Sequence, residues 1–281
     1  MDNDELQKKI EDLFAQPVSS PESKSLLATV RQRLSEGALR VAEPVESLSA
    51  AGPRAWKVNI WVKKAILLMA RLGDIQKVKG AQLDSYGAEM DTLPWLYTSP
   101  AMCRMPLGSS LREGAFLSPG VTCMPPSVLQ IGCHVGSGTT IDSMVSIGLG
   151  AQIGSGVQLS CRATIGGWIA PLDDLPTIIE DGALLGTGSG VYDGSQIGAK
   201  AVLLAGTQIL SSLGLYDLGT ESMLPRIKGE PLRVPENAIV AMGSRPVGTR
   251  GMHIQLPIIV GKRQGPHVRD WEMYTDLQLM L

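Results

Sequence analysis

The chain has 281 residues, enough for one large domain or two modest ones, and its formal net charge of −2 gives no sign of a nucleic-acid or anionic-membrane partner. No apolar run reaches the length that spans a bilayer, and the charged stretch from Met1 to Ile10 lacks the apolar core of a signal peptide. No pair among the four cysteines has C-x-x-C spacing, which disfavours a zinc or redox motif. We therefore expect a cytoplasmic protein without a metal centre.

The first hundred residues (1–100) are predicted to form a mainly helical domain. Apolar side chains recur at helical spacing between Asp4 and Phe14. A second helix is expected to begin at Pro21, a favoured first helical residue, and to end at Gly37. A short strand is expected from Leu39 to Ala42, and a third helix from Ala55 to Leu72.

The middle of the chain carries an apolar residue at every sixth position. These residues are Leu117, Cys123, Leu129, Val135, Ile141, Ile147, Ile153, Leu159 and Ile165 and, after a change of phase, Ile179, Leu185, Val191, Ile197, Leu203 and Ile209. A period of six fits neither a helix nor a lone strand, but it is typical of a hexapeptide β-helix, where three short strands make one triangular turn. We predict a mainly β fold, a left-handed parallel β-helix, over residues 101–246.

Two stretches interrupt the repeat and are predicted to be insertions. Residues near 168–175 change its phase and are expected to form a loop pushed out of one corner, and residues 211–233 form a longer irregular segment. The last region, residues 247–281, is predicted to contain a strand from His253 to Val260. A terminal helix from about Val268 would then cap the open end of the solenoid.

Several short motifs in and around the repeat occur together in a known family. They are Gly37-Ala-Leu-Arg-Val-Ala-Glu43, Trp61-Val-Lys-Lys-Ala-Ile-Leu-Leu68, Arg112-Glu-Gly-Ala-Phe116, Ile141-Asp-Ser143, Ala151-Gln-Ile-Gly154, Ile165-Gly-Gly167 and Pro176-Thr-Ile-Ile-Glu-Asp181. From about Gly37 to Val260 the chain resembles the tetrahydrodipicolinate N-succinyltransferase family. That resemblance implies a homotrimer of the lysine and diaminopimelate pathway that transfers an acyl group from succinyl-CoA to the amine of an amino dicarboxylate.

The resemblance also indicates which residues serve catalysis and acceptor binding. Asp142 matches the family's acidic residue near the nucleophilic amine, where a carboxylate accepts a proton or orients the amine. An aspartate that only hydrogen-bonds its own turn is the alternative. The candidates for binding the acceptor are Arg104, Arg112, Ser143 and Arg162, because guanidinium groups bind carboxylates through two hydrogen bonds.

A third group of residues is expected to bind the acyl-CoA. The candidates are Gly166, Gly167, Ala205, Gly206, Ser244, Lys262 and Arg263. Among them, Ser244 begins a Ser-Arg-Pro segment that resembles the family's closing turn beside CoA. Lys262 and Arg263 resemble its terminal basic pair, which suits the CoA phosphates, although a solvated basic pair explains them nearly as well.

The chain departs from the family pattern where a later coil should carry an arginine and a glutamate. These positions are Gly188 and Gly190, and the tryptophan expected after Asp142 and Ser143 is Met144. An altered acceptor is therefore expected unless Arg162 or Asp193 restores the lost contact. An acetyl-CoA-dependent relative in antimetabolite biosynthesis, of the tabtoxin type, is the alternative function.

A non-catalytic role is the alternative of another class. A β-helix used only for assembly would need no acidic residue in a groove, no extruded loop and no N-terminal domain. A zinc enzyme of the γ carbonic anhydrase type needs three histidines, whereas His134 is the only histidine in the coil. Coil histidines act as general bases in many hexapeptide acetyltransferases, but the residues around His134 do not match that pattern.

Overall fold

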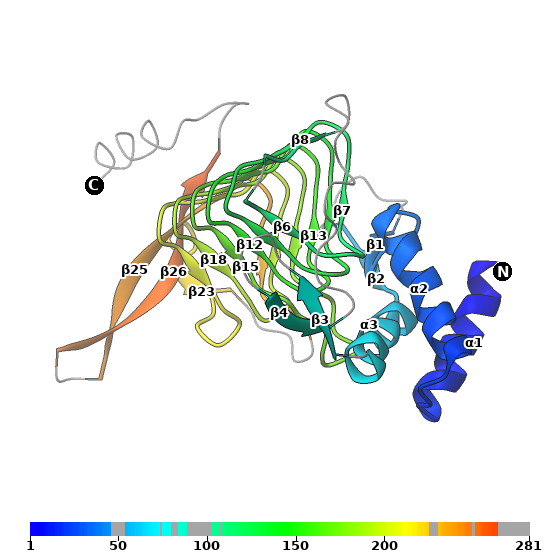
Figure 1. Ribbon diagram of the computed structural model, residues 1–281. Coiled ribbons are helices and arrows are strands. Elements are labelled where there is room, and N and C mark those ends of the chain that lie inside the picture. Colours follow the sequence, from blue (N-terminus) through cyan, green and yellow to red (C-terminus); the bar gives the residue numbers. More distant parts are fainter. Residues whose placement is uncertain are drawn as a thin grey trace.

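The computed structural model describes residues 1–45, 54–73, 103–106, 108–224, 230–248 and 251–263, together with the backbone of two strands at 75–79 and 84–88. Stacked triangular turns of parallel strands form the body of the molecule, and the N-terminal helices lie against its first turns (Figure 1). Among the described residues, none of the helices has the length and apolar character required to cross a bilayer.

The N-terminal helices form close to where the sequence predicts them. They are α1 (Asn3–Ala15), α2 (Pro21–Ser35) and α3 (Ile60–Leu72). The Asp2 and Ser20 side chains cap α1 and α2 by accepting backbone N–H groups, which satisfies donors that the first helical turn leaves free. Apolar residues of all three helices share one buried cluster with Ile131 of the coil, so this domain packs directly on the solenoid.

Two predicted boundaries in this domain are wrong. The third helix does not begin at Ala55, because β2 (Trp56–Val58) pairs antiparallel with β1 (Ala42–Pro44) before α3 starts at Ile60. The strand expected over residues 39–42 accordingly lies further along the chain. Cross-strand pairing supplies partners for the backbone that a local helical pattern does not reveal. A second antiparallel pair, β3 (Ile75–Lys79) with β4 (Asp84–Ala88), was also not predicted.

The solenoid has three faces, which we call A, B and C in the order in which the chain visits them. Face A contains β5 (Cys103–Arg104), β8 (Val121–Cys123), β11 (Thr140–Ile141), β14 (Gln158–Leu159), β17 (Leu184–Leu185), β20 (Val202–Leu203) and the start of β25 (Ala238–Val247). Face B contains β6 (Ser110–Leu111), β9 (Val128–Leu129), β12 (Ser146–Ile147), β15 (Thr164–Ile165), β18 (Gly190–Val191) and β21 (Gln208–Ile209). Face C contains β7 (Phe116–Leu117), β10 (His134–Val135), β13 (Gln152–Ile153), β16 (Ile178–Ile179), β19 (Gln196–Ile197) and β24 (Arg233–Val234).

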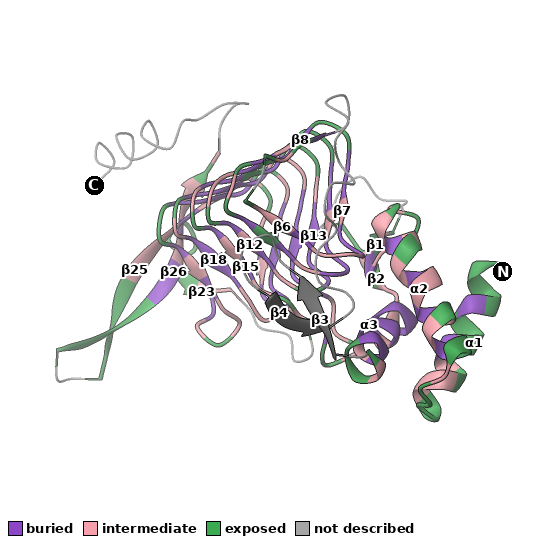
Figure 2. Ribbon diagram, viewed as in Figure 1, coloured by how far each residue is buried: buried purple, intermediate pink, exposed green. Residues whose placement is uncertain are grey.

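The predicted interior of the repeat is confirmed. Every sixth-position residue from Leu117 to Ile209 is buried, and all of them belong to one apolar cluster. Buried stretches recur from coil to coil along the solenoid (Figure 2). The change of phase is also explained, because Ile153 pairs with Ile179 and Ile165 with Val191 across the extruded loop. The parallel β-helix is therefore present, while its left-handed sense stays a prediction.

The chain leaves the solenoid as a long hairpin. β25 continues past face A and pairs antiparallel with β26 (Met252–Lys262), which corresponds to the strand predicted from His253 to Val260. Inside the second insertion, β22 (Tyr216–Asp217) pairs with β26 and with β23 (Ser222–Met223). The closing turn expected at Ser244 is wrong, because that residue lies within the extended β25. The predicted terminal helix lies outside the described residues.

Candidate active site

Three corners join the faces, and the one between faces A and B carries the predicted catalytic residue. Asp142, Ser143 and Met144 form this A–B corner directly after β11. Hydrogen bonds stack it on the corners of later coils, because Arg162 N donates to Ser143 O (3.0 Å) and Gly188 N donates to Cys161 O (3.0 Å). The structure therefore brings Asp142, Ser143 and Arg162 together, with Gly188 on the next coil.

The Asp142 carboxylate is half-buried and held by its own turn. Its Oδ1 accepts the Ser143 N–H at 2.6 Å, while its backbone N–H donates to Leu159 O at 2.9 Å. The first bond is the turn contact of the alternative interpretation, yet it also fixes the direction of the carboxylate. The Asp142 carboxylate thus has a fixed orientation at the corner, and it can accept a proton or a hydrogen bond from an amine.

Arg162 is the cation of this corner. It is exposed and has a φ of 62°, a backbone conformation in the left-handed region that is unusual for a residue other than glycine. One coil later, a side-chain carbon built on Gly188 would meet nothing within 4 Å, so the space beside Arg162 is open. Within one chain Arg162 does not lie beside Gly166 and Gly167, because β15 separates these residues and places them at different corners.

Most of the other candidate residues lie away from the A–B corner of one chain. Ala205 and Gly206 lie at this corner, and Arg104 is in register with Thr122 on the outer side of face A. Arg112, Gly166 and Gly167 lie at the corner between faces B and C, and Ser244 is exposed on the hairpin. Lys262 ends β26 and Arg263 follows it near the corner between faces C and A, which we call the C–A corner.

A groove of about 630 Å³ follows the C–A corner beside face A. Its lining includes Thr140 and Gln158 of face A, together with two cations, Lys200 and Arg263. The Arg263 guanidinium donates to Gly182 O (3.1 Å) and Lys200 O (3.4 Å), which fixes it on the groove wall. Because Thr140 lies two residues before Asp142, the groove approaches the acidic corner.

Sequence reasoning missed Lys200, although the repeat contains a signal for it. At the C–A corner, earlier coils place glycine at the position with a left-handed φ, including Gly138, Gly156 and Gly182. Lys200 occupies the same corner position with a φ of 57° and Asn237 with a φ of 59°. A lysine in a conformation that favours glycine, beside a groove, marks a position where strain coincides with a candidate binding surface.

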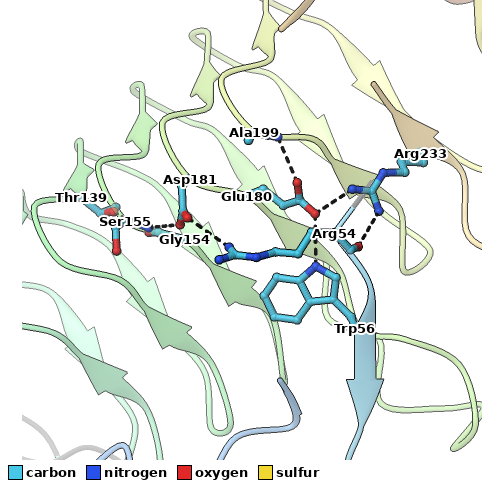
Figure 3. Close-up of polar contacts among 9 residues, drawn as sticks. All are labelled: Arg54, Trp56, Thr139, Gly154, Ser155, Glu180, Asp181, Ala199 and Arg233. Carbon is cyan, nitrogen blue, oxygen red and sulfur yellow. Dashed lines mark hydrogen bonds and ion pairs between the residues drawn. The ribbon is translucent and has the colours of Figure 1, made fainter. Parts of the chain in front are cut away.

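A buried ion pair between two solenoid residues, Glu180 and Arg233, lies beside the groove, and further polar contacts tie it to the N-terminal domain (Figure 3). Glu180 is 3% exposed, and its carboxylate accepts Arg233 Nη2 (2.8 Å), Trp56 Nε1 (3.2 Å) and Ala199 N (3.1 Å). The neighbouring Asp181 pairs with Arg54 at 3.0 Å. Three segments distant in sequence therefore meet at one corner, and removing one partner of such a buried pair costs about 3–5 kcal/mol.

His134 is unsuited to general base catalysis. It lies on face C against the Phe116 ring, with 4.9 Å between ring centroids. Burial, and then the nearby positive charge of Arg40, lower its pKa to about 3. The imidazole is therefore neutral at physiological pH and a weak proton acceptor. No cluster of three or more His, Cys, Asp or Glu side chains arranged to hold a metal ion occurs in the described part of the chain.

The extruded loop is anchored to α3 by Lys63, whose side chain is fully buried. Its Nζ donates to Pro171 O (3.1 Å) and Asp174 O (2.6 Å), and Trp168 Nε1 donates to Asp174 Oδ2 within the loop. Burial lowers the Lys63 pKa from 10.5 to about 8, opposed by the charges of Asp174 and Asp173. The motif that contains Lys63 thus positions the loop over the N-terminal domain.

We expect Lys63 to make the free energy of unfolding increase as the pH rises from 8 to 10.5. Between pH 8 and 10.5 the unfolded chain binds the Lys63 proton more strongly, so the wild type gains stability as pH rises. Relative to Lys63→Met, this gain should be on the order of 2–3 kcal/mol. Urea unfolding of the wild type and of Lys63→Met at pH 7 and pH 10 measures this gain. The titration of all groups common to both proteins cancels when their free energies of unfolding are subtracted. A pH-independent difference would contradict the buried ammonium.

The comparisons with known proteins place this geometry in a family. Residues 5–72 match the model described as "Tetrahydrodipicolinate N-succinyltransferase N-terminal". A 2,3,4,5-tetrahydropyridine-2,6-dicarboxylate N-succinyltransferase of Methylobacterium sp. (strain 4-46) is 35% identical over 220 residues, covering 76% of this chain and 73% of the relative. The chain belongs to this N-succinyltransferase family. It is therefore an acyltransferase, as the motifs predict.

Other members of the N-succinyltransferase family match over a larger share of the chain. The enzyme of the same name from Dechloromonas aromatica (strain RCB) is 33% identical over 266 residues, or 92% of each chain. Among solved structures, a putative 2,3,4,5-tetrahydropyridine-2-carboxylate N-succinyltransferase of Campylobacter jejuni gives a TM-score of 0.43 at 15% identity, covering 83% of this chain and 62% of that one.

Proposed function

We propose that this chain transfers a succinyl group from succinyl-CoA to the amine of tetrahydropyridine-2,6-dicarboxylate, in its open amino dicarboxylate form, or of a close relative. The observation that supports this most strongly is the likeness to named N-succinyltransferases over up to 92% of the chain, N-terminal domain included. The clustering of Asp142, Ser143 and Arg162 at one corner adds a site of suitable chemistry. The lysine and diaminopimelate pathway is the expected context.

In the proposed reaction, the acceptor amine attacks the thioester carbonyl and the CoA thiolate leaves. Asp142 holds the amine or takes its proton, while Arg162 and Arg104 suit the acceptor's carboxylates. The groove with Lys200 and Arg263 suits the phosphates of CoA, since both side chains are cationic donors. Holding thioester and amine in line supplies much of the rate, because positioning removes the entropy cost of the encounter.

We further propose a cytoplasmic homotrimer of left-handed solenoids with the predicted domain limits of 1–100, 101–246 and 247–281. The candidate residues are spread over three corners, face A and the hairpin of one chain, which makes a site completed by a neighbouring copy the simplest way to bring them together. A closed ring of copies is the arrangement that such head-to-tail contacts favour. Light scattering is the direct measurement, and a stable monomer at micromolar concentration would contradict the shared site.

A donor and acceptor panel tests the proposed function. Purified protein is mixed with succinyl-CoA or acetyl-CoA and several amino dicarboxylates, and the release of free CoA thiol is followed. Because Gly188 and Gly190 remove two charged side chains, we expect tetrahydropyridine-2,6-dicarboxylate to be used with a kcat/KM below about 10⁴ M⁻¹s⁻¹. A higher value would identify a standard succinyltransferase with a rearranged site. Preference for acetyl-CoA would support the antimetabolite alternative, and no thiol release would contradict acyl transfer.

A further inference from the structure

The outer side of face B carries an aromatic ring lying on two glycines. Tyr192 follows β18 and turns back over the face. A side-chain carbon built on Gly166 would lie 3.0 Å from Tyr192 Cδ1, and one built on Gly190 would lie 2.5 Å from Tyr192 Cε2 and 2.6 Å from its hydroxyl oxygen. Any larger residue at Gly190 would have to displace this phenol. The Tyr192 ring therefore fills the space that a side chain on Gly190 would take, and its hydroxyl group lies there.

A second polar atom is fixed beside this hydroxyl. Gln208 is the register partner of Gly190 on the next coil, and its Nε2 donates to Gly188 O (2.9 Å) and Gly206 O (3.2 Å). These two bonds set the orientation of the amide. Its Oε1 consequently lies 2.4 Å from the position of a side-chain carbon on Gly190, in the same place as the phenol. The pair presents one hydroxyl and one carbonyl oxygen, both uncharged.

This pair lies within reach of the acidic corner. Gly190 comes two residues after Gly188, which is stacked one coil above Arg162 and two coils above the Asp142 corner. Strands of a sheet are about 4.8 Å apart, so Asp142 and Gly190 are separated by about 10 Å along the solenoid. A small extended acceptor can follow this offset past Gly188, where a built side-chain carbon would meet nothing within 4 Å.

We propose that Tyr192 and Gln208 form a neutral subsite that binds one polar end of the acceptor, with its hydrogen-bonding group held by the hydroxyl and the amide carbonyl. The inference rests on the proposed function and specifies its substrate. The acceptor is a small molecule whose far end offers an uncharged or donor group at Gly190, because the described side chains nearest to that position, Tyr192 and Gln208, are both neutral. The charged end faces Arg162.

The variant Tyr192→Phe tests the subsite, because it removes the hydroxyl oxygen and keeps the ring packed on Gly166 and Gly190. We expect the KM for the best acceptor of the panel to rise about three- to tenfold, the usual effect of one lost hydrogen bond. The KM for acyl-CoA and the midpoint of urea unfolding should not change. Tyr216→Phe, in β22 and away from face B, is the matched control and should behave as wild type.

A second variant keeps the test independent of the phenol itself. Gly190→Ala should push the ring aside and raise the same KM, and combining it with Tyr192→Phe should add little. Unchanged acceptor kinetics in both single variants of an active enzyme would overturn the subsite while leaving the proposed function standing. A wild type that releases no thiol with any acceptor would contradict the proposed function, and this inference with it.

Discussion

Asp142→Asn should lower kcat/KM for acyl transfer by about a hundredfold or more, the range typical of a lost general base. The amide keeps an oxygen that can accept the Ser143 N–H, so the turn at 2.6 Å survives. What disappears is the negative charge that holds the amine or accepts its proton. Thiol release at saturating acyl-CoA measures the effect, and the affinity for CoA should stay unchanged because the groove cations are untouched.

A matched control separates catalysis from turn structure at Asp142. Asp217, the last residue of β22, also holds a turn with its carboxylate, because its Oδ1 accepts the N–H of Gly219, two residues later, at 2.8 Å. Asp217→Asn makes the same chemical change in another carboxylate-held turn, several strands away from β11 and the Asp142 corner. It should retain wild-type turnover. If Asp142→Asn retained it too, Asp142 would be no more than a turn residue.

Ile153→Asp should leave no folded protein. Ile153 is 1% exposed and stacks between Val135 and Ile179 in the apolar column of the solenoid. A carboxylate there has no described partner and costs several kcal/mol to bury, against a total stability of about 5–15 kcal/mol. Circular dichroism and size-exclusion chromatography of the expressed protein would show the loss of the β signal and aggregation.

Position within the strand is what makes this substitution severe. Gln158 lies on the exposed outer side of face A, one residue before the buried Leu159. Gln158→Asp should fold with a nearly unchanged unfolding midpoint, and Ile153→Val should cost only about 0.5–1.5 kcal/mol. A native-like Ile153→Asp protein would mean that the inward and outward registers have been interchanged.

The sequence alone determined the solenoid, because its evidence is local and repeated. Each inward residue from Leu117 to Ile209 meets another apolar residue one coil away, so a period of six is sufficient to assign the interior. The extruded loop follows from the same reasoning, since eight inserted residues shift the phase without breaking the pairing of Ile153 with Ile179. The N-terminal helices also follow from local caps and spacing.

Only the tertiary structure decided which side chains share a site. Stacking placed Arg162 above Asp142 and apart from Gly166, although Arg162 and Gly166 are only four residues apart. A solenoid brings together residues one coil apart, so closeness along the chain does not mean closeness at a corner. The buried Lys63, the Glu180 ion pair and the packing of Tyr192 on Gly166 depend on contacts between distant segments, and no local pattern in the sequence encodes those contacts.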